Sequence, residues 1–202
     1  IGSVCAELLA GEVERLVLIG RSREKLEGLR DRLQLKYRSE IVVSLTMDAL
    51  AESQLILTVT SAVHDVIRPE HLQPGSVVCD VARPRDVSAM VASARDDILV
   101  IDGGMVDVPG PVDFHFNFGF PPGKAYACMA ETIALTLEGR FEDYTLGKHL
   151  TRERVEEIDA VCKKHGFRVS GFRSFEKEVT EAQIETVRRN AKRVRKLLAT
   201  HP

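Results

Sequence analysis

Short apolar runs alternate with segments of helical periodicity through the first half of the chain, and this alternation limits the possible folds more than any other feature. Continuous apolar runs that end in small or polar residues are typical of buried parallel strands. We expect strands at residues 15–20, 41–45, 55–62, 76–82 and 98–104. We expect helices between them at residues 1–10, 22–37 and 87–95, with a short helical turn at 46–53. This rhythm predicts βαβ units and an α/β fold with a mostly parallel sheet.

The order of these elements predicts a Rossmann-like, doubly wound sheet with additional C-terminal helices. After Gly104 the sequence changes to a segment rich in proline, glycine and phenylalanine, which we interpret as an irregular loop at 105–124 with at most one short strand. Three helices are expected after it, at residues 124–138, 151–165 and 176–198. We therefore predict an NAD(P)-binding domain over residues 1–122 and a helical part over 123–202 that packs on it.

The net charge, the cysteine count and the lack of long apolar runs argue against several classes of function. A net charge of -2 over 202 residues gives no general attraction to nucleic acid or to anionic membranes. The basic stretch 188–196 is interpreted as a solvated helix face, with contact to an acidic partner as the alternative. Four cysteines without a CxxC pair indicate neither a zinc site nor a disulfide framework and favour a reducing compartment, so we expect a cytoplasmic protein with no metal. No run suits a membrane span. The start at Ile1 inside a helical pattern suggests a fragment that lacks the first strand.

Two positions near the start of the chain are candidates for binding the phosphates of a dinucleotide. Gly2 would be the last glycine of the turn that brings a helix N-terminus to the pyrophosphate. Arg21, Ser22 and Arg23 follow the strand at 15–20, where an acidic residue would select NAD(H) and basic residues favour a 2′-phosphate. We predict NADPH, with a solvated helix start as the alternative interpretation.

Small residues at two later strand ends complete the predicted cofactor site. Thr60 and Ser61 end the strand at 55–62, where small hydroxyl-bearing residues let the cofactor pass close to the backbone. Gly103 and Gly104 leave room for a nicotinamide ring. A plain strand end and a tight turn are the respective alternatives.

Cys128 is the candidate nucleophile. It follows Pro121-Pro122-Gly123. We expect a helix to begin just after these residues, so Cys128 falls in the first or second helical turn. The helix dipole there stabilises a thiolate, the reactive form of cysteine. A buried, inert cysteine is the alternative.

Several stretches resemble the cyanobacterial long-chain acyl-[acyl-carrier-protein] reductases. They are IGS (1–3), LVLIGRSREKLEGL (16–29), IDGG (101–104), AYACMAETIALTLEG (125–139), YTLGK (144–148) and DAVCKKHGF (159–167). The resemblance implies that Cys128 takes an acyl group as a thioester from acyl-carrier protein or acyl-CoA, and that NADPH reduces it to a fatty aldehyde.

Two other functions stay open at this point. One is a shikimate-dehydrogenase-like, NADP-dependent reductase of a small carbonyl compound, which needs no cysteine. The other is a non-catalytic cofactor-binding or assembly module, whose last helix packs on its own domain or on a second copy in a homo-oligomer. His115 and Asn117, in the loop before the Cys128 helix, offer hydrogen-bond donors but receive no assigned role.

Overall fold

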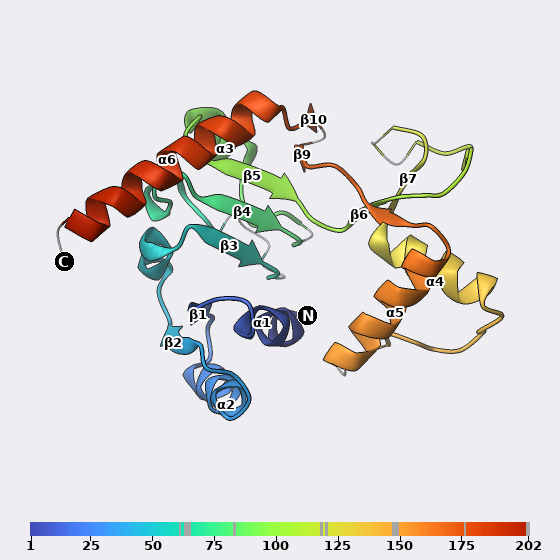
Figure 1. The fold of residues 1–202 in the computed structure, drawn as a ribbon, viewed down its shortest axis with the longest axis horizontal. Coiled ribbons are helices and arrows are strands. Elements are labelled where there is room, and N and C mark those ends of the chain that lie inside the picture. Colours follow the sequence, from blue (N-terminus) through green and yellow to red (C-terminus); the bar gives the residue numbers. More distant parts are fainter. Residues whose placement is uncertain are drawn as a thin grey trace. The chain divides into compact units, whose positions relative to one another are not determined.

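The computed structural model divides the chain into two compact units. Unit 1 comprises residues Ile1–Ile101 together with the segment from Thr180 onward, and unit 2 comprises Asp102–Val179. Figure 1 shows the elements of both units. The structure describes residues 1–60, 62, 66–82, 84–117, 119, 121–146, 150–175 and 177–200, the last helix with side chains to residue 197.

Unit 1 opens with two helices and a pair of parallel strands. These are α1 (Gly2–Ala10), β1 (Arg15–Ile19), α2 (Arg23–Gln34) and β2 (Glu40–Ser44). β1 and β2 pair in parallel, with Arg15 opposite Glu40 and Ile19 opposite Ser44. One core cluster joins all four elements because their buried apolar side chains face one another; it contains Ala6, Ala10, Leu18, Leu33 and Ile41.

A second sheet of unit 1 has the strand order β3-β4-β5. Its elements and the short helices around it are η1 (Met47–Glu52), β3 (Leu55–Thr58), η2 (Pro69–His71), β4 (Val77–Asp80), α3 (Ala89–Ala94) and β5 (Leu99–Asp102). β3 and β4 pair in parallel, and Figure 1 shows β5 running in the same direction. The sheet is apolar in its interior, as parallel strands covered by helices require.

The last helix, α6 (Glu181–Thr200), belongs to unit 1. The Gln54 side-chain amide donates a hydrogen bond to the Ala191 carbonyl at 3.1 Å. Val187 is buried, whereas the basic residues between Arg188 and Lys196 lie on exposed positions. One face of α6 therefore packs on its own unit, and the basic stretch forms the other face, as predicted.

Unit 2 is built on a small sheet with the order β7-β6-β8. β6 (Met105–Asp107) pairs antiparallel with β7 (Lys124–Tyr126) and with β8 (Arg168–Val169). Helices α4 (Ala127–Leu137) and α5 (Arg152–Lys164) pack together around Ala130, Ala134 and Phe167. A hairpin of β9 (Arg173–Ser174) and β10 (Lys177–Glu178) completes the unit.

The predicted α/β class is confirmed, and three details differ from expectation. The helix expected over 176–198 begins at Glu181, because Lys177 and Glu178 pair with β9. The helix expected from Lys124 begins at Ala127, because residues 124–126 pair with β6 instead. The predicted division after residue 122 does not coincide with the two units: β6 and β7 hold the loop 108–123 within unit 2, while α6 joins unit 1. In the described part of the chain, no helix is both long and apolar enough to cross a membrane.

Candidate functional site

The N-terminus of α1 lies at the carboxyl end of β3. A Cβ atom added to Gly2 would lie 3.2 Å from Val59 Cγ2, so the helix and the strand end approach as closely as a glycine allows. No side chain caps the N-terminus of α1. Uncapped amides and the helix dipole favour an anionic group there, so this terminus fits the phosphates of a dinucleotide.

The three predicted residues after β1 lie at the start of α2. Ser22 is the N-cap of this helix, and its hydroxyl accepts a hydrogen bond from the Lys25 amide at 3.5 Å. Arg23 forms an ion pair with Glu27 at 3.5 Å. Arg21 is exposed and has no polar partner among the described residues. The role of Arg21, Ser22 and Arg23 in binding a 2′-phosphate stays a prediction.

Thr60 follows β3 and is held by a buried carboxylate that the sequence analysis did not identify. Asp86 is fully buried. It accepts hydrogen bonds from the Thr60 amide at 3.1 Å and from the Thr60 hydroxyl at 2.5 Å, as well as from the Thr58 hydroxyl. The hydrogen bond from the Thr60 hydroxyl to Asp86 therefore fixes the backbone conformation after β3. The role of Thr60 in cofactor binding stays a prediction. Ser61 lies outside the described residues.

A second buried carboxylate, Asp80, ends β4. It accepts hydrogen bonds from the amides of Ala82, Asp86 and Val87 at 2.9–3.0 Å. Burial raises the pKa of Asp80, and the nearby Asp86 adds to the rise, against the opposing effect of the three amides. The two aspartates fix the turn after β4 against the end of β3. Asp80 ends a strand in the sequence pattern, but an acidic residue at a strand end also suits an ordinary turn, so the sequence did not single it out.

Gly103 and Gly104 follow β5, and Gly104 connects to the Cys128 helix. Gly104 has a φ of +82°, a conformation that side chains rarely adopt, and a Cβ added there would meet open space. Its carbonyl accepts a hydrogen bond from the Ala127 amide at 2.8 Å. The structure thus brings Gly104 next to the first residue of α4, within unit 2.

Cys128 is the second residue of α4 and is exposed. The sequence predicted the first or second helical turn, and the structure places Cys128 in the first turn. The thiol is exposed, so the buried alternative is wrong for it. The other three cysteines are half-buried. Burial raises the pKa of Cys5 and of Cys162, which keeps these two thiols protonated and poorly nucleophilic.

A polar cluster beside β7 also went unpredicted. The Lys124 ammonium donates hydrogen bonds to Asp107 Oδ1 and to Ser170 Oγ, both at 2.6 Å. Lys124 is largely buried, and its hydrogen bond lowers the pKa of the Asp107 carboxyl. The cluster ties β6, β7 and the residue after β8 together. Since Lys124 precedes Cys128 by one helical turn in sequence, the cluster also anchors the entry to α4.

The donors considered in the loop before α4 are both exposed. His115 has a φ of 51°, and its amide donates to Asp113 Oδ1 at 2.7 Å. The Asn117 side-chain oxygen accepts from the Gly119 amide at 2.8 Å. The side chains of Asp113 and Asn117 thus stabilise local turns in this loop. Among the described residues, no group of histidine, cysteine or acidic side chains has the arrangement of a metal site.

Comparison with known proteins assigns the family. Residues 1–102 match the family described as shikimate / quinate 5-dehydrogenase. The chain belongs to this family through the half that carries β1 to β5. The family places it among the oxidoreductases that use nicotinamide cofactors.

Three curated proteins share sequence with the chain. It is 37% identical over 196 residues to the aminotransferase PigE of Serratia sp. (strain ATCC 39006), covering 93% of this chain and 23% of that protein. It is 29% identical over 159 residues to the long-chain acyl-[acyl-carrier-protein] reductase of Synechococcus elongatus, covering 75% of this chain and 44% of that protein. It is 30% identical over 100 residues to the glutamyl-tRNA reductase of Caldicellulosiruptor saccharolyticus, covering 48% and 24%.

These comparisons support the resemblance in part. The acyl-carrier-protein reductase is a distant relative, and PigE is more similar. The chain spans less than half the length of each of these relatives. What they support together is a nicotinamide-dependent oxidoreductase fold with reductase relatives.

Proposed function

We propose that the chain is the nicotinamide-binding and cysteine-bearing portion of a reductase that converts an acyl thioester into an aldehyde. The observation that carries this proposal is the exposure of Cys128 in the first turn of α4. The similarity to an acyl-carrier-protein reductase extends over 75% of the chain and so exceeds the dehydrogenase match at residues 1–102.

In the first chemical step, the Cys128 thiol acts as the nucleophile. Cys128 Sγ attacks the carbonyl carbon of the substrate thioester, a new carbon–sulfur bond forms, and the bond to the carrier's sulfur breaks. The electron pair leaves with the carrier, which takes up a proton as a free thiol. The cost of this exchange is small because one thioester replaces another, and the acyl group is then held on the protein.

The start of α4 suits this role. The amides of its first turn point toward the N-terminus, and the dipole stabilises negative charge on a nearby sulfur. The hydrogen bond from Ala127 to Gly104 fixes the helix start to the glycine that follows β5. Gly104, with open space at its α-carbon, leaves room beside the helix start for the acyl carbon.

Residues at the strand ends of unit 1 would hold the cofactor. The uncapped start of α1 at Gly2 would bind the pyrophosphate, and Arg21 and Ser22 would contact a 2′-phosphate on the adenosine ribose. When bound, NADPH supplies the hydride that, with a proton, reduces the acyl-enzyme to the aldehyde and restores the Cys128 thiol.

Peptide mapping of the acylated enzyme tests the role of Cys128. The full-length protein is incubated with an acyl-carrier protein or acyl-CoA thioester in the absence of NADPH, then digested and examined by mass spectrometry. We expect one acyl group, on the peptide that contains Cys128, and none in Cys128→Ala. Cys162→Ser is the matched control, because it removes a half-buried thiol from the same unit and leaves the adduct in place. An adduct that persists in Cys128→Ala contradicts the proposal.

The substitution Arg21→Ala tests the proposed preference for NADPH over NADH. Removing one charged hydrogen bond to a phosphate from an exposed side chain is expected to weaken NADPH binding about 10-fold and to leave NADH binding unchanged. Arg38→Ala is the matched control, since Arg38 is also exposed but lies beyond the opposite end of α2. Equal effects of the two substitutions on NADPH binding would remove the basis for the preference.

The family match favours one alternative, a dehydrogenase-type reduction of a small carbonyl substrate. Such a reaction transfers hydride directly and has no use for a thiol. Turnover of the full-length Cys128→Ser variant separates the two functions. Loss of activity supports the thioester mechanism, and unchanged activity supports the alternative.

A further inference from the structure

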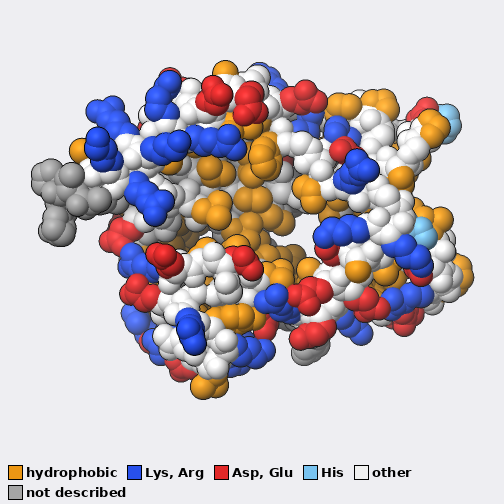
Figure 2. All heavy atoms as spheres, in the orientation of Figure 1, with side chains coloured by type: hydrophobic (Ala, Val, Ile, Leu, Met, Phe, Trp, Pro, Cys, Tyr) orange, Lys and Arg blue, Asp and Glu red, His pale blue; other side chains and the backbone are white. Residues whose placement is uncertain are grey.

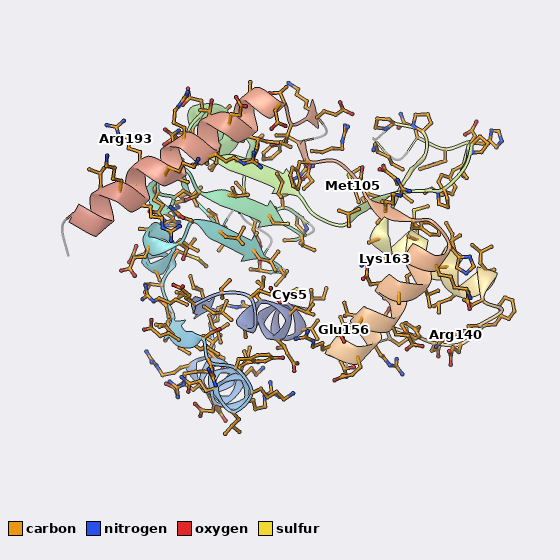
Figure 3. All side chains as sticks on the ribbon, viewed as in Figure 1. Cys5, Met105, Arg140, Glu156, Lys163 and Arg193 are labelled. Carbon is orange, nitrogen blue, oxygen red and sulfur yellow. The ribbon has the colours of Figure 1, made fainter. Side chains whose placement is uncertain are left out.

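Six basic side chains gather on α6, all of them exposed. This basic face of α6 consists of Arg188, Arg189, Lys192, Arg193, Arg195 and Lys196. Figure 2 shows Lys and Arg side chains grouped over the region that α6 occupies in Figure 1. Arg193, labelled in Figure 3, projects from the helix away from the β3-β4-β5 sheet. The face extends over about 12 Å along the helix axis.

The positive charge of this face is not balanced within the helix. α6 has no acidic residue after Glu185. Arg188 lies 3.9 Å from Glu181, and both side chains are exposed, so this ion pair contributes little. Three of the six basic residues have no acidic partner in the part of the chain that the structure describes: Lys192, Arg193 and Arg195.

The rest of the chain has the opposite net charge. Without the basic face it has 22 basic and 30 acidic side chains, which is a net charge of -8 against +6 on the face. Such an uneven distribution attracts an acidic partner to one side of the molecule and repels it elsewhere. A surface that serves solubility alone has both signs of charge interspersed. The distribution therefore indicates a binding surface for an acidic partner.

The other face of α6 limits the kinds of partner. Ile184, Val187, Ala191 and Val194 recur at helical spacing, and each is buried or half-buried. The backbone of Ala191 lies against Gly75 of the same unit. Because this apolar stripe packs within the protein, it is not available to a lipid surface. α6 also has no aromatic side chain on which nucleic-acid bases could stack.

A protein with an acidic surface is the partner that these charges fit. The inference rests on the proposed function, in which acyl-carrier protein or acyl-CoA delivers the thioester. Coenzyme A is a small molecule whose phosphates suit a concave pocket better than an exposed helix face. Acyl-carrier protein is small and strongly acidic, so several of its carboxylates can pair with several of these cations at once. We propose that the basic face of α6 is the docking surface for the acyl-carrier protein that delivers the substrate.

Docking of this kind affects the encounter and leaves the chemistry unchanged. Exposed cations accelerate association with an acidic partner, and salt screens the attraction. Substituting the basic face should therefore lower kcat/KM for the carrier-bound substrate and leave kcat unchanged. Added salt should weaken carrier binding in the same way.

Binding of acyl-carrier protein without an acyl group tests the proposal. Fluorescently labelled carrier is titrated with the full-length protein at low salt, and binding is followed by fluorescence anisotropy. Lys192→Glu/Arg193→Glu is expected to weaken binding about 10-fold or more. Arg32→Glu/Arg38→Glu is the matched control, because it changes the net charge equally at exposed positions on and just after α2 and leaves α6 intact.

Turnover of two substrates with the same acyl chain separates docking from catalysis. In Lys192→Glu/Arg193→Glu, kcat/KM for the acyl-carrier protein should fall about 10-fold or more, while kcat/KM for acyl-CoA stays unchanged. An equal fall with both substrates overturns the proposal, because the substitution then affects the reductase itself.

The other outcomes of the binding measurement are equally decisive. Unchanged carrier binding in the α6 variant, or equal weakening in the control, overturns the proposal. Binding to duplex DNA or to phosphatidylserine vesicles that is lost in the α6 variant, with carrier binding unchanged, overturns it in favour of a nucleic acid or a membrane surface. Carrier binding is also measured in Cys128→Ala, so the docking surface and the thioester mechanism can fail independently of each other.

Discussion

Substituting Gly75 by alanine tests how firmly α6 is held in unit 1. Gly75 has a φ of +84°, and a Cβ atom added to it would lie 2.2 Å from the Ala191 nitrogen and 2.5 Å from the Ala191 α-carbon. These atoms belong to the backbone of α6, so no side-chain rotation relieves the overlap. The helix must move away from the turn before β4.

The expected cost is the sum of three effects. A left-handed conformation costs a non-glycine residue about 1–2 kcal/mol. Displacement of α6 exposes the buried Val187 side chain, which loses about 1.5–3 kcal/mol of burial. It also breaks the hydrogen bond from Gln54 to Ala191, a loss of about 1 kcal/mol. Gly75→Ala should therefore lower the free energy of unfolding by about 3.5–6 kcal/mol.

Urea denaturation followed by circular dichroism measures this loss. Gly110→Ala is the control, because Gly110 has a similar φ of +79° but open space at its α-carbon. It should lose only the conformational cost of about 1–2 kcal/mol. Equal losses in the two variants would show that α6 does not pack against Gly75, and the reasoning would fail.

Two further substitutions probe the buried polar groups. Asp86→Ala leaves the hydroxyls of Thr58 and Thr60 without their acceptor and should lower the free energy of unfolding by about 2–4 kcal/mol in urea titrations; a loss within error of zero would mean that the carboxylate does not hold this turn. Burial, reinforced by the hydrogen bond to Glu157, raises the pKa of Tyr144 to about 12. The folded state then retains this proton above the ordinary value of about 10, so its stabilising effect is complete below pH ~10 and is lost as pH rises toward about 12. Tyr144→Phe should reduce this loss of stability at alkaline pH. The measurement is the urea midpoint as a function of pH, and the same pH dependence in Tyr144→Phe and in the unsubstituted protein would contradict the role given to Tyr144.

The sequence predicted most of unit 1 because its signals are local. Apolar runs such as 15–20 and 55–62 lie where β1 and β3 form, and Ser22 caps α2 as its type predicts. The preceding prolines and glycine placed Cys128 in the first or second turn of a helix, and the structure places it in the first turn of α4. These features depend on residues within a few positions of one another.

What the sequence did not predict depends on distant partners. Lys124 is a strand residue because β6 pairs with it, and nothing near it in sequence signals a strand. Asp86 is a structural residue because Thr58 and Thr60, at the end of a different strand, donate hydrogen bonds to it, and nothing near Asp86 in the sequence signals these contacts. Gly75 has the sequence of a surface turn and becomes a packing site only because α6 returns to it.

A single-turnover experiment tests the central claim that Cys128 carries the acyl group to reduction. The full-length protein is acylated, separated from the carrier and mixed with NADPH, and both cofactor oxidation and aldehyde release are followed. We predict that each acyl group on Cys128 yields one aldehyde and oxidises one NADPH. An isolated acyl-enzyme that consumes no NADPH, or steady reduction of acyl thioester by Cys128→Ala, would contradict it.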